Sequence, residues 1–141
     1  MKKHVLFVCT GNSCRSQMAE AFVNHFLSDR FEAVSAGTEP SSPNPLALQV
    51  LEEIGLSHKG ARSKHLTEFD DRKFDHVITL CDHANESCPV YFGNTKREHL
   101  GFDDPAKASG SPDEIIAEFR RVRDEIGVKV MEYLQKQIIS D

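Results

Sequence analysis

The stretch of sequence that decides the fold reads Val5-Leu6-Phe7-Val8-Cys9-Thr10-Gly11-Asn12-Ser13-Cys14-Arg15-Ser16. Its four apolar residues predict a buried strand ending on Cys9, and apolar residues at helical spacing predict a helix that begins at Ser16. A strand, a tight loop and a helix N-terminus direct unpaired backbone N–H groups at one point. Arg15 adds a planar set of donors that suits a tetrahedral oxyanion. The sequence therefore predicts an oxyanion-binding loop at residues 10–16, called the anion loop below.

Cys9 lies at the base of this loop. The loop N–H groups, the helix dipole and Arg15 all favour its thiolate, so the loop is expected to supply a nucleophile as well as an anion site. Ser16 could donate a hydrogen bond to that thiolate, act as the helix N-cap, or do both. Cys14 is expected to point into the core and is given no redox role. The alternative is that Cys9 is a buried structural cysteine and Arg15 a surface residue.

Composition limits the classes of function. With 141 residues, 39% hydrophobic and 28% charged, the chain is expected to form one globular domain over residues 1–141. Its net charge of -5 argues against non-specific nucleic-acid binding. The sequence shows no signal peptide and no apolar run long enough for a membrane span. We therefore expect a cytoplasmic monomer whose four cysteines are reduced at rest.

Periodicity and turn residues predict an alternation of strands and helices. The expected strands are residues 4–8, 34–36, 74–81 and, more weakly, 98–102; the expected helices are 16–28, 45–54 and one long helix from residue 112. This order predicts an α/β fold with a parallel sheet covered by helices on both faces. Ligands bind at the carboxyl ends of such strands, where both Cys9 and Cys81 fall. Neighbouring strands would bring the two sulfurs to one edge.

Two further cysteines, Cys81 and Cys88, predict redox chemistry. Reducing an oxyanion takes two electrons, which a thiol pair supplies by becoming a disulfide. Cys81 could attack a covalent adduct on Cys9 and expel the reduced oxyanion, and Cys88 could then move the disulfide to Cys81–Cys88. The alternatives are a core thiol at Cys81 with an incidental surface thiol at Cys88, or a zinc site with His83, whose spacings match no structural zinc pattern.

Geometry adds a condition to this relay. A disulfide needs Cα atoms about 4.4–6.8 Å apart, whereas seven helical steps span roughly 10 Å. If residues 82–88 are helical in the reduced protein, they must unwind or fold back when the bond forms.

The loop from Cys9 to Ser16 resembles the phosphate-binding loop of low-molecular-weight protein tyrosine phosphatases, and the three cysteines resemble those of the thioredoxin-coupled arsenate reductases built on that scaffold. The likeness covers nearly the whole chain and includes Thr79-Leu80-Cys81, Cys88-Pro89 and Gly101-Phe102-Asp103-Asp104-Pro105-Ala106. It implies the sheet order 2-1-3-4, nucleophilic attack on arsenate by Cys9, and a disulfide that migrates through Cys81 and Cys88 to be reduced by thioredoxin.

The resemblance also assigns an acid and raises the question of a cation. Asp104, before Pro105, matches the family's general acid, although residue chemistry alone does not choose between it and Asp103. Some family members bind potassium through residues that match Asn12, Glu20 and Ser35 and through a carboxylate where this chain has Lys64. We expect the Lys64 ammonium to replace the ion beside Glu20, so that no cofactor is needed; the alternative is a solvated surface lysine.

Three functions compete. The first is the reduction of arsenate to arsenite by the cysteine relay, in the service of arsenic detoxification and with a weak phosphatase side activity. The second is a tyrosine phosphatase with protective thiols, which is disfavoured because Ala106-Lys107-Ala108 provides no aromatic wall after the Asp-Pro pair. The third is a non-catalytic adaptor, which would not need Cys9, Arg15 and Asp104 together.

Overall fold

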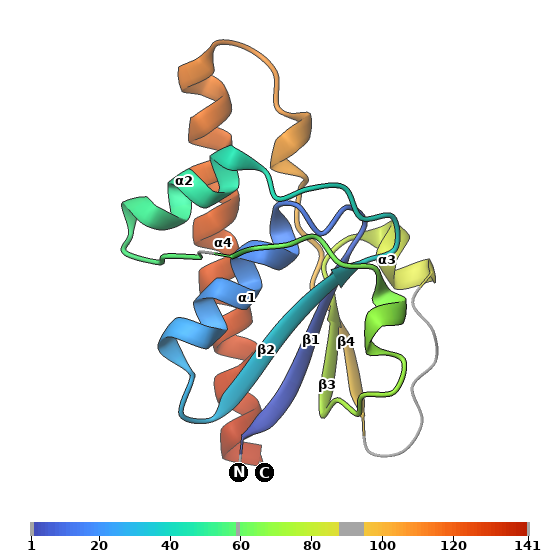
Figure 1. Ribbon diagram of the computed structural model, residues 1–141. Helices are drawn as coiled ribbons and strands as arrows, with labels where there is room; N and C mark the ends of the chain where they lie inside the picture. Colours follow the sequence, from blue (N-terminus) through green and yellow to red (C-terminus); the bar gives the residue numbers. More distant parts are fainter. Residues whose placement is uncertain (1, 59, 88–94, 141) are drawn as a thin grey trace.

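One parallel sheet organises the chain. The structure is a computed structural model that describes residues 2–58, 60–87 and 95–140. Within these residues β1 (Lys3–Cys9), β2 (Phe31–Gly37), β3 (His76–Thr79) and β4 (Lys96–His99) form a sheet in the order β2-β1-β3-β4, with every pairing parallel (Figure 1). The α/β class and the predicted strand order are therefore confirmed.

Long helices cover the sheet and short elements connect it. The elements are α1 (Arg15–Phe26), α2 (Pro45–Glu53), η1 (Leu66–Phe69), α3 (Asp82–Ser87), η2 (Pro105–Lys107) and α4 (Pro112–Ser140). Figure 1 shows α1, α2 and α4 together on one side of the sheet, with the short η1 and α3 on the other. The side chains of Val5, Leu6, Phe7 and Val8 are all fully buried, so both faces of β1 are covered. Among the described residues, no helix is long and apolar enough to span a membrane.

The helix caps that the sequence suggests are present. The Asn44 side chain accepts the Leu46 N–H at 2.8 Å, with Pro45 as the first residue of α2. At α4 the Ser111 hydroxyl accepts the Glu114 N–H, and the Glu114 carboxylate accepts the Ser111 N–H, each at 3.2 Å. This reciprocal pair is a capping box, and it fixes where the long helix begins.

Three expected elements differ from those observed. β2 begins at Phe31 rather than at residue 34, because pairing with β1 along its whole length extends the strand through Glu32 and Ala33, which have little strand propensity. β3 is limited to His76–Thr79, since the chain then turns into α3. The fourth strand is Lys96–His99, not 98–102; its charged, mostly exposed residues suit the edge of a sheet and conceal it from an apolar pattern.

The end of β2 lies directly against the anion loop. A Cβ atom at Gly37 would come within 2.5 Å of the Thr10 carbonyl oxygen, so this approach requires glycine. The register pairs Cys9 with Gly37 and Val8 with Thr79, and the Leu80 N–H donates to the Val8 carbonyl at 2.9 Å. β1 therefore brings the ends of both neighbouring strands to the loop.

Candidate active site

The backbone carbonyls from residue 9 to residue 14 are all bound by the protein around the loop. Segment 38–44 binds four of them, α1 binds one, and two side chains bind the Asn12 carbonyl. The donors are Thr38 N to Cys9 O (3.2 Å), Glu39 N to Thr10 O (2.9 Å), Ser41 N to Gly11 O (3.0 Å), Gln17 Nε2 and Ser63 Oγ to Asn12 O (2.9 and 2.7 Å), Asn44 N to Ser13 O (3.0 Å) and Met18 N to Cys14 O (2.9 Å). A trans peptide points its N–H away from its C=O, so outward carbonyls direct the loop N–H groups inward, where the Asn12 N–H bonds to Cys9 Sγ.

Cys9 is the sulfur at the base of the loop. Its side chain is almost fully buried, its Sγ lies 2.8 Å from Ser16 Oγ, and it accepts the Asn12 N–H at 3.2 Å. The Asn12 amide donates to Ser16 Oγ at 2.7 Å, which leaves the Ser16 proton for the sulfur. Two donors therefore point at the Cys9 sulfur. Ser16 takes this role and not that of an N-cap, because α1 starts one residue earlier.

Asn12 adopts a left-handed backbone conformation, with φ of 50°. Asparagine tolerates this region better than most residues with a side chain. The conformation lets one residue serve the loop at three points: its N–H contacts Cys9, its amide nitrogen contacts Ser16, and its Oδ1 accepts the Lys64 N–H at 2.9 Å.

Arg15 connects the loop to the segment before η2. Its Nη1 donates to the Phe102 carbonyl at 3.2 Å, and its Nη2 lies 3.7 Å from Asp104 Oδ2. The Asp104 Oδ1 accepts the Ala106 N–H at 3.0 Å, which fixes the carboxylate at the start of η2. The guanidinium and the candidate acid therefore lie on the same side of the loop.

Asp103 has a different environment from its neighbour. Its Oδ2 lies 3.0 Å from Arg121 Nη2, and the same guanidinium also pairs with Glu118 through Nη2 and with Glu125 through Nη1, both on α4. The Asp103 side chain is 79% exposed, compared with 24% for Asp104. This geometry favours Asp104, the choice that the resemblance implied.

A cleft of about 770 Å³ opens beside the loop. It is lined by Thr10, Arg15, Cys81, Asp82, His83, Gly101, Phe102, Asp103, Asp104, Lys107 and Glu125. The candidate acid, the candidate second cysteine and the loop arginine thus face one space.

Cys81 is coupled to both the loop and α3. Its Sγ lies 3.2 Å from Thr10 Oγ1 and accepts the Ala84 N–H at 3.4 Å. The predicted meeting of Cys9 and Cys81 at one sheet edge is thereby supported by a direct contact with the loop residue that follows Cys9. Cys88, the third residue of the predicted relay, lies outside the described residues. The described residues bring no group of three or more potential metal ligands together, and His83 lies 3.9 Å from Glu39.

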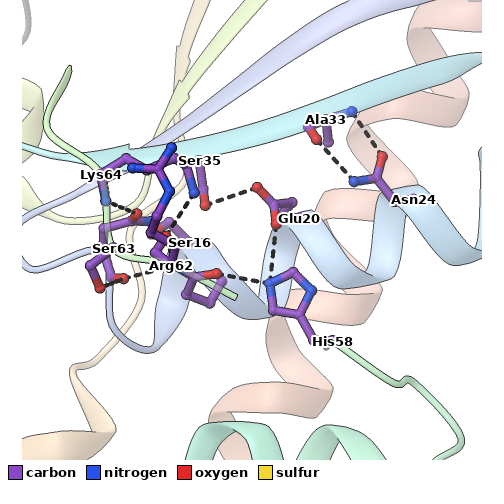
Figure 2. A network of polar contacts seen from close by, with 11 residues as sticks. Ser16, Glu20, Asn24, Ala33, Ser35, His58, Arg62, Ser63 and Lys64 are labelled. Atoms are coloured by element: carbon purple, nitrogen blue, oxygen red, sulfur yellow. Dashed lines mark hydrogen bonds and ion pairs between the residues drawn. The ribbon is translucent and has the colours of Figure 1, made fainter. Parts of the chain in front are cut away.

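The residues expected at a cation site lie close together. His58, which the sequence did not single out, lies beside Glu20. The Glu20 carboxylate accepts the Ser35 hydroxyl at 3.1 Å through Oε1, and its Oε2 lies 3.1 Å from His58 Nε2 (Figure 2). The side chains of Glu20 and His58 are each only 13% exposed. Nothing in the polar sequence of residues 57–67 distinguishes His58.

Lys64 interacts with Glu20 at longer range and makes its direct hydrogen bond elsewhere. Its ammonium donates to the Arg62 carbonyl at 2.8 Å, and among the described residues the ion-pair partner of Glu20 is His58. Burial lowers the pKa of Lys64, and the nearby Glu20 carboxylate opposes that shift only in part. Each Glu20 oxygen and Asn12 Oδ1 thus faces one protein donor, and the Lys64 ammonium lies close enough to interact with the Glu20 carboxylate.

The fold and the site define a class of protein: an α/β protein with a cysteine-based oxyanion loop at the end of its first strand. Residues 4–140 match the family described as low molecular weight phosphotyrosine protein phosphatase, and the chain belongs to that family. It is 46% identical over 136 residues to the arsenate reductase of Shouchella clausii, covering 95% of this chain and 96% of that protein.

Solved structures give the same placement. A structure described as an arsenate reductase in the phosphate binding state superposes with a TM-score of 0.77 and 32% identity, covering 96% of this chain and 98% of that one. A thioredoxin-dependent arsenate reductase from Corynebacterium glutamicum gives 0.74 and 30%, covering 99% of this chain and 64% of that one.

The two cysteines of the loop are expected to differ in reactivity. Burial raises the pKa of Cys14 to about 11, with the hydrogen bond from Ser13 only partly opposing it. Below that pH the neutral thiol prevails, and thiolate is the form that alkylates. Near neutral pH, iodoacetamide should therefore modify Cys9 and leave Cys14 intact, with Cys14 reacting only as the pH approaches 11. Peptide mass spectrometry measures this, and guanidinium-unfolded protein, in which both react, is the control. Equal rates in the native protein would contradict the assignment.

Proposed function

We propose that the protein reduces arsenate to arsenite. Its family, the arsenate reductases among its relatives and its anion loop support this reaction. Phosphate and arsenate have the same shape and charge, so the same loop is expected to give a weak phosphatase side activity.

The proposed reaction uses three sulfurs in turn. The Cys9 thiolate attacks As(V), Asp104 protonates the departing oxygen, and a Cys9–arsenic bond forms. The Cys81 thiolate then attacks Cys9 Sγ; the sulfur–arsenic bond breaks with its electron pair on arsenic, which leaves as arsenite. The Cys88 thiolate next attacks Cys81 and expels the Cys9 thiolate. The resulting Cys81–Cys88 disulfide is reduced by a dithiol.

The contact between Cys81 and Thr10 is the observation that carries this proposal. A phosphatase reaction needs only Cys9, Arg15 and an acid, and no electrons are transferred. Here a second thiol at the mouth of the cleft contacts the loop residue directly after Cys9, at 3.2 Å. This position suits the attack on an adduct held by Cys9.

We propose thioredoxin as the dithiol, and a cytoplasmic monomer as the working form, with arsenic detoxification as the role. The Corynebacterium glutamicum relative is a thioredoxin-dependent arsenate reductase, which agrees with a migrating disulfide. The cytosol keeps thiols reduced, as the resting state of the relay requires.

A phosphotyrosine phosphatase is the second candidate, and the cleft lining argues against it. Of the described lining residues, Phe102 is the aromatic one; its side chain is only 8% exposed and lies under the Lys129 ammonium, 5.6 Å from its ring centre. Among the described residues, the lining therefore offers no exposed Phe or Tyr ring against which a phosphotyrosine could pack.

The relay is tested by serine variants in one coupled assay. Arsenate-dependent NADPH consumption with thioredoxin and its reductase should be abolished by Cys9→Ser, Cys81→Ser and Cys88→Ser. Each variant lacks a sulfur atom that forms one of the two successive disulfides. Hydrolysis of an aryl phosphate should be lost only in Cys9→Ser. Cys14→Ser is the matched control and should retain both activities. Sustained turnover at the wild-type rate by Cys88→Ser would overturn the relay and favour the phosphatase.

The two adjacent aspartates provide a test of the acid. Asp104→Asn should lower aryl phosphate hydrolysis by about 10²–10⁴-fold, the usual contribution of a general acid. Asp103→Asn removes an exposed ion pair with Arg121, which contributes little, and is the control. Steady-state rates over a range of leaving groups measure the effect, which should shrink as the leaving group becomes more acidic. A larger loss for Asp103→Asn would reverse the assignment.

We further propose that activity does not require potassium, because the candidate ligands accept protein donors and the Lys64 ammonium lies near Glu20. Turnover in sodium and potassium buffers of equal ionic strength should be the same. Strong activation by potassium would refute this. Lys64→Asp is the informative variant, since restoring a carboxylate should make the rate respond to potassium.

A further inference from the structure

The Asn12 carbonyl differs from the other carbonyls of the loop. Its neighbours from residue 9 to residue 14 are bound by backbone N–H groups, whereas Asn12 O is bound by the side chains of Gln17 and Ser63. The peptide that carries this carbonyl also carries the Ser13 N–H, which points the opposite way, toward the inside of the loop. The orientation of one anion donor therefore depends on side chains.

Gln17 is held in a single orientation. Its side chain is fully buried, and its Nε2 donates to Asn12 O at 2.9 Å and to Arg62 O at 3.1 Å. A flipped amide would direct its oxygen at these two carbonyls. With the amide in this orientation, Gln17 Oε1 is a hydrogen-bond acceptor, and His58 Nε2 lies 2.8 Å from it.

His58 donates through that nitrogen. Its Nε2 lies between two acceptors, Gln17 Oε1 and the Glu20 carboxylate at 3.1 Å, so this nitrogen carries a proton. Ser35 on β2 donates to the other oxygen of Glu20 (Figure 2). A continuous series of hydrogen bonds thus runs from the sheet through Glu20, His58 and Gln17 to the loop.

We propose that Gln17, oriented by His58 and Glu20, is a positioning residue that holds the Ser13 N–H toward the bound oxyanion. Gln17 also ties Arg62 to the loop, and so steadies the segment from which Ser63 and the Lys64 N–H bind Asn12. The inference rests on the proposed oxyanion-binding function of the loop.

The test measures phosphate binding separately from Cys9 reactivity. We expect inorganic phosphate to protect Cys9 from iodoacetamide, so that the phosphate dependence of the alkylation rate gives a dissociation constant. Gln17→Leu should weaken phosphate binding about tenfold, as expected when one hydrogen bond to a charged group is lost. Its alkylation rate without phosphate should change much less, because the donors to Cys9 Sγ are Asn12 and Ser16.

His58 variants provide a second route to the same measurement, should Gln17→Leu fail to fold. His58→Leu should weaken phosphate binding in the same direction, His58→Gln should restore it by supplying an N–H donor, and Gln17→Leu with His58→Leu should be no worse than Gln17→Leu alone. Gln49→Leu and His25→Leu, at exposed positions on α2 and α1, are the matched controls.

The outcomes separate this inference from the function on which it rests. Wild-type Cys9 that phosphate does not protect would refute the oxyanion loop itself. Protected wild type together with folded Gln17→Leu and His58→Leu variants that bind phosphate equally well would refute only the positioning role. A lower melting temperature with an unchanged dissociation constant would mean that Gln17 is merely structural.

Discussion

The outward orientation of the backbone carbonyls from Cys9 to Cys14 is the constraint on which the rest of the structure depends. Backbone N–H groups can surround an anion only if their carbonyls find partners elsewhere, since a buried carbonyl without one costs about 1–3 kcal/mol. Those partners come from α1, which follows the loop directly, and from segment 38–44 and Ser63, which are distant in sequence. The parallel sheet brings them together, because β2 runs beside β1 and ends at Gly37 against the loop.

The same loop holds two buried cysteines in different hydrogen-bonding environments. The Cys9 sulfur is contacted by the Asn12 N–H and by the Ser16 hydroxyl. Cys14 is equally buried, but burial dominates its environment and keeps the thiol protonated. Burial therefore does not by itself decide the reactivity of a cysteine; the hydrogen-bond donors around the sulfur decide it.

Local sequence predicted those features that local chemistry fixes. The apolar run before Cys9, the capping box at Ser111 and the Asn-Pro start of α2 act over a few residues, and each was found where expected. The full length of β2 and the charged edge strand β4 are set by pairing with distant strands, which periodicity does not record. The sequence did not identify His58 for a similar reason. Its partners Gln17 and Glu20 lie about forty residues earlier, and only the fold brings them together.

The position of Cys81 links redox state to local structure in the proposed relay. Its sulfur accepts the Ala84 N–H and so stabilises the first turn of α3, the helix that follows it directly. Seven helical steps separate two residues by roughly 10 Å, whereas a disulfide needs Cα atoms about 4.4–6.8 Å apart. A bond between Cys81 and Cys88 is therefore incompatible with an intact helix between them. In the proposed relay the Cys81 sulfur forms the disulfide, and the same atom accepts the Ala84 N–H at the start of α3. Oxidation at Cys81 is therefore expected to weaken the hydrogen bond that stabilises the helix in the reduced protein.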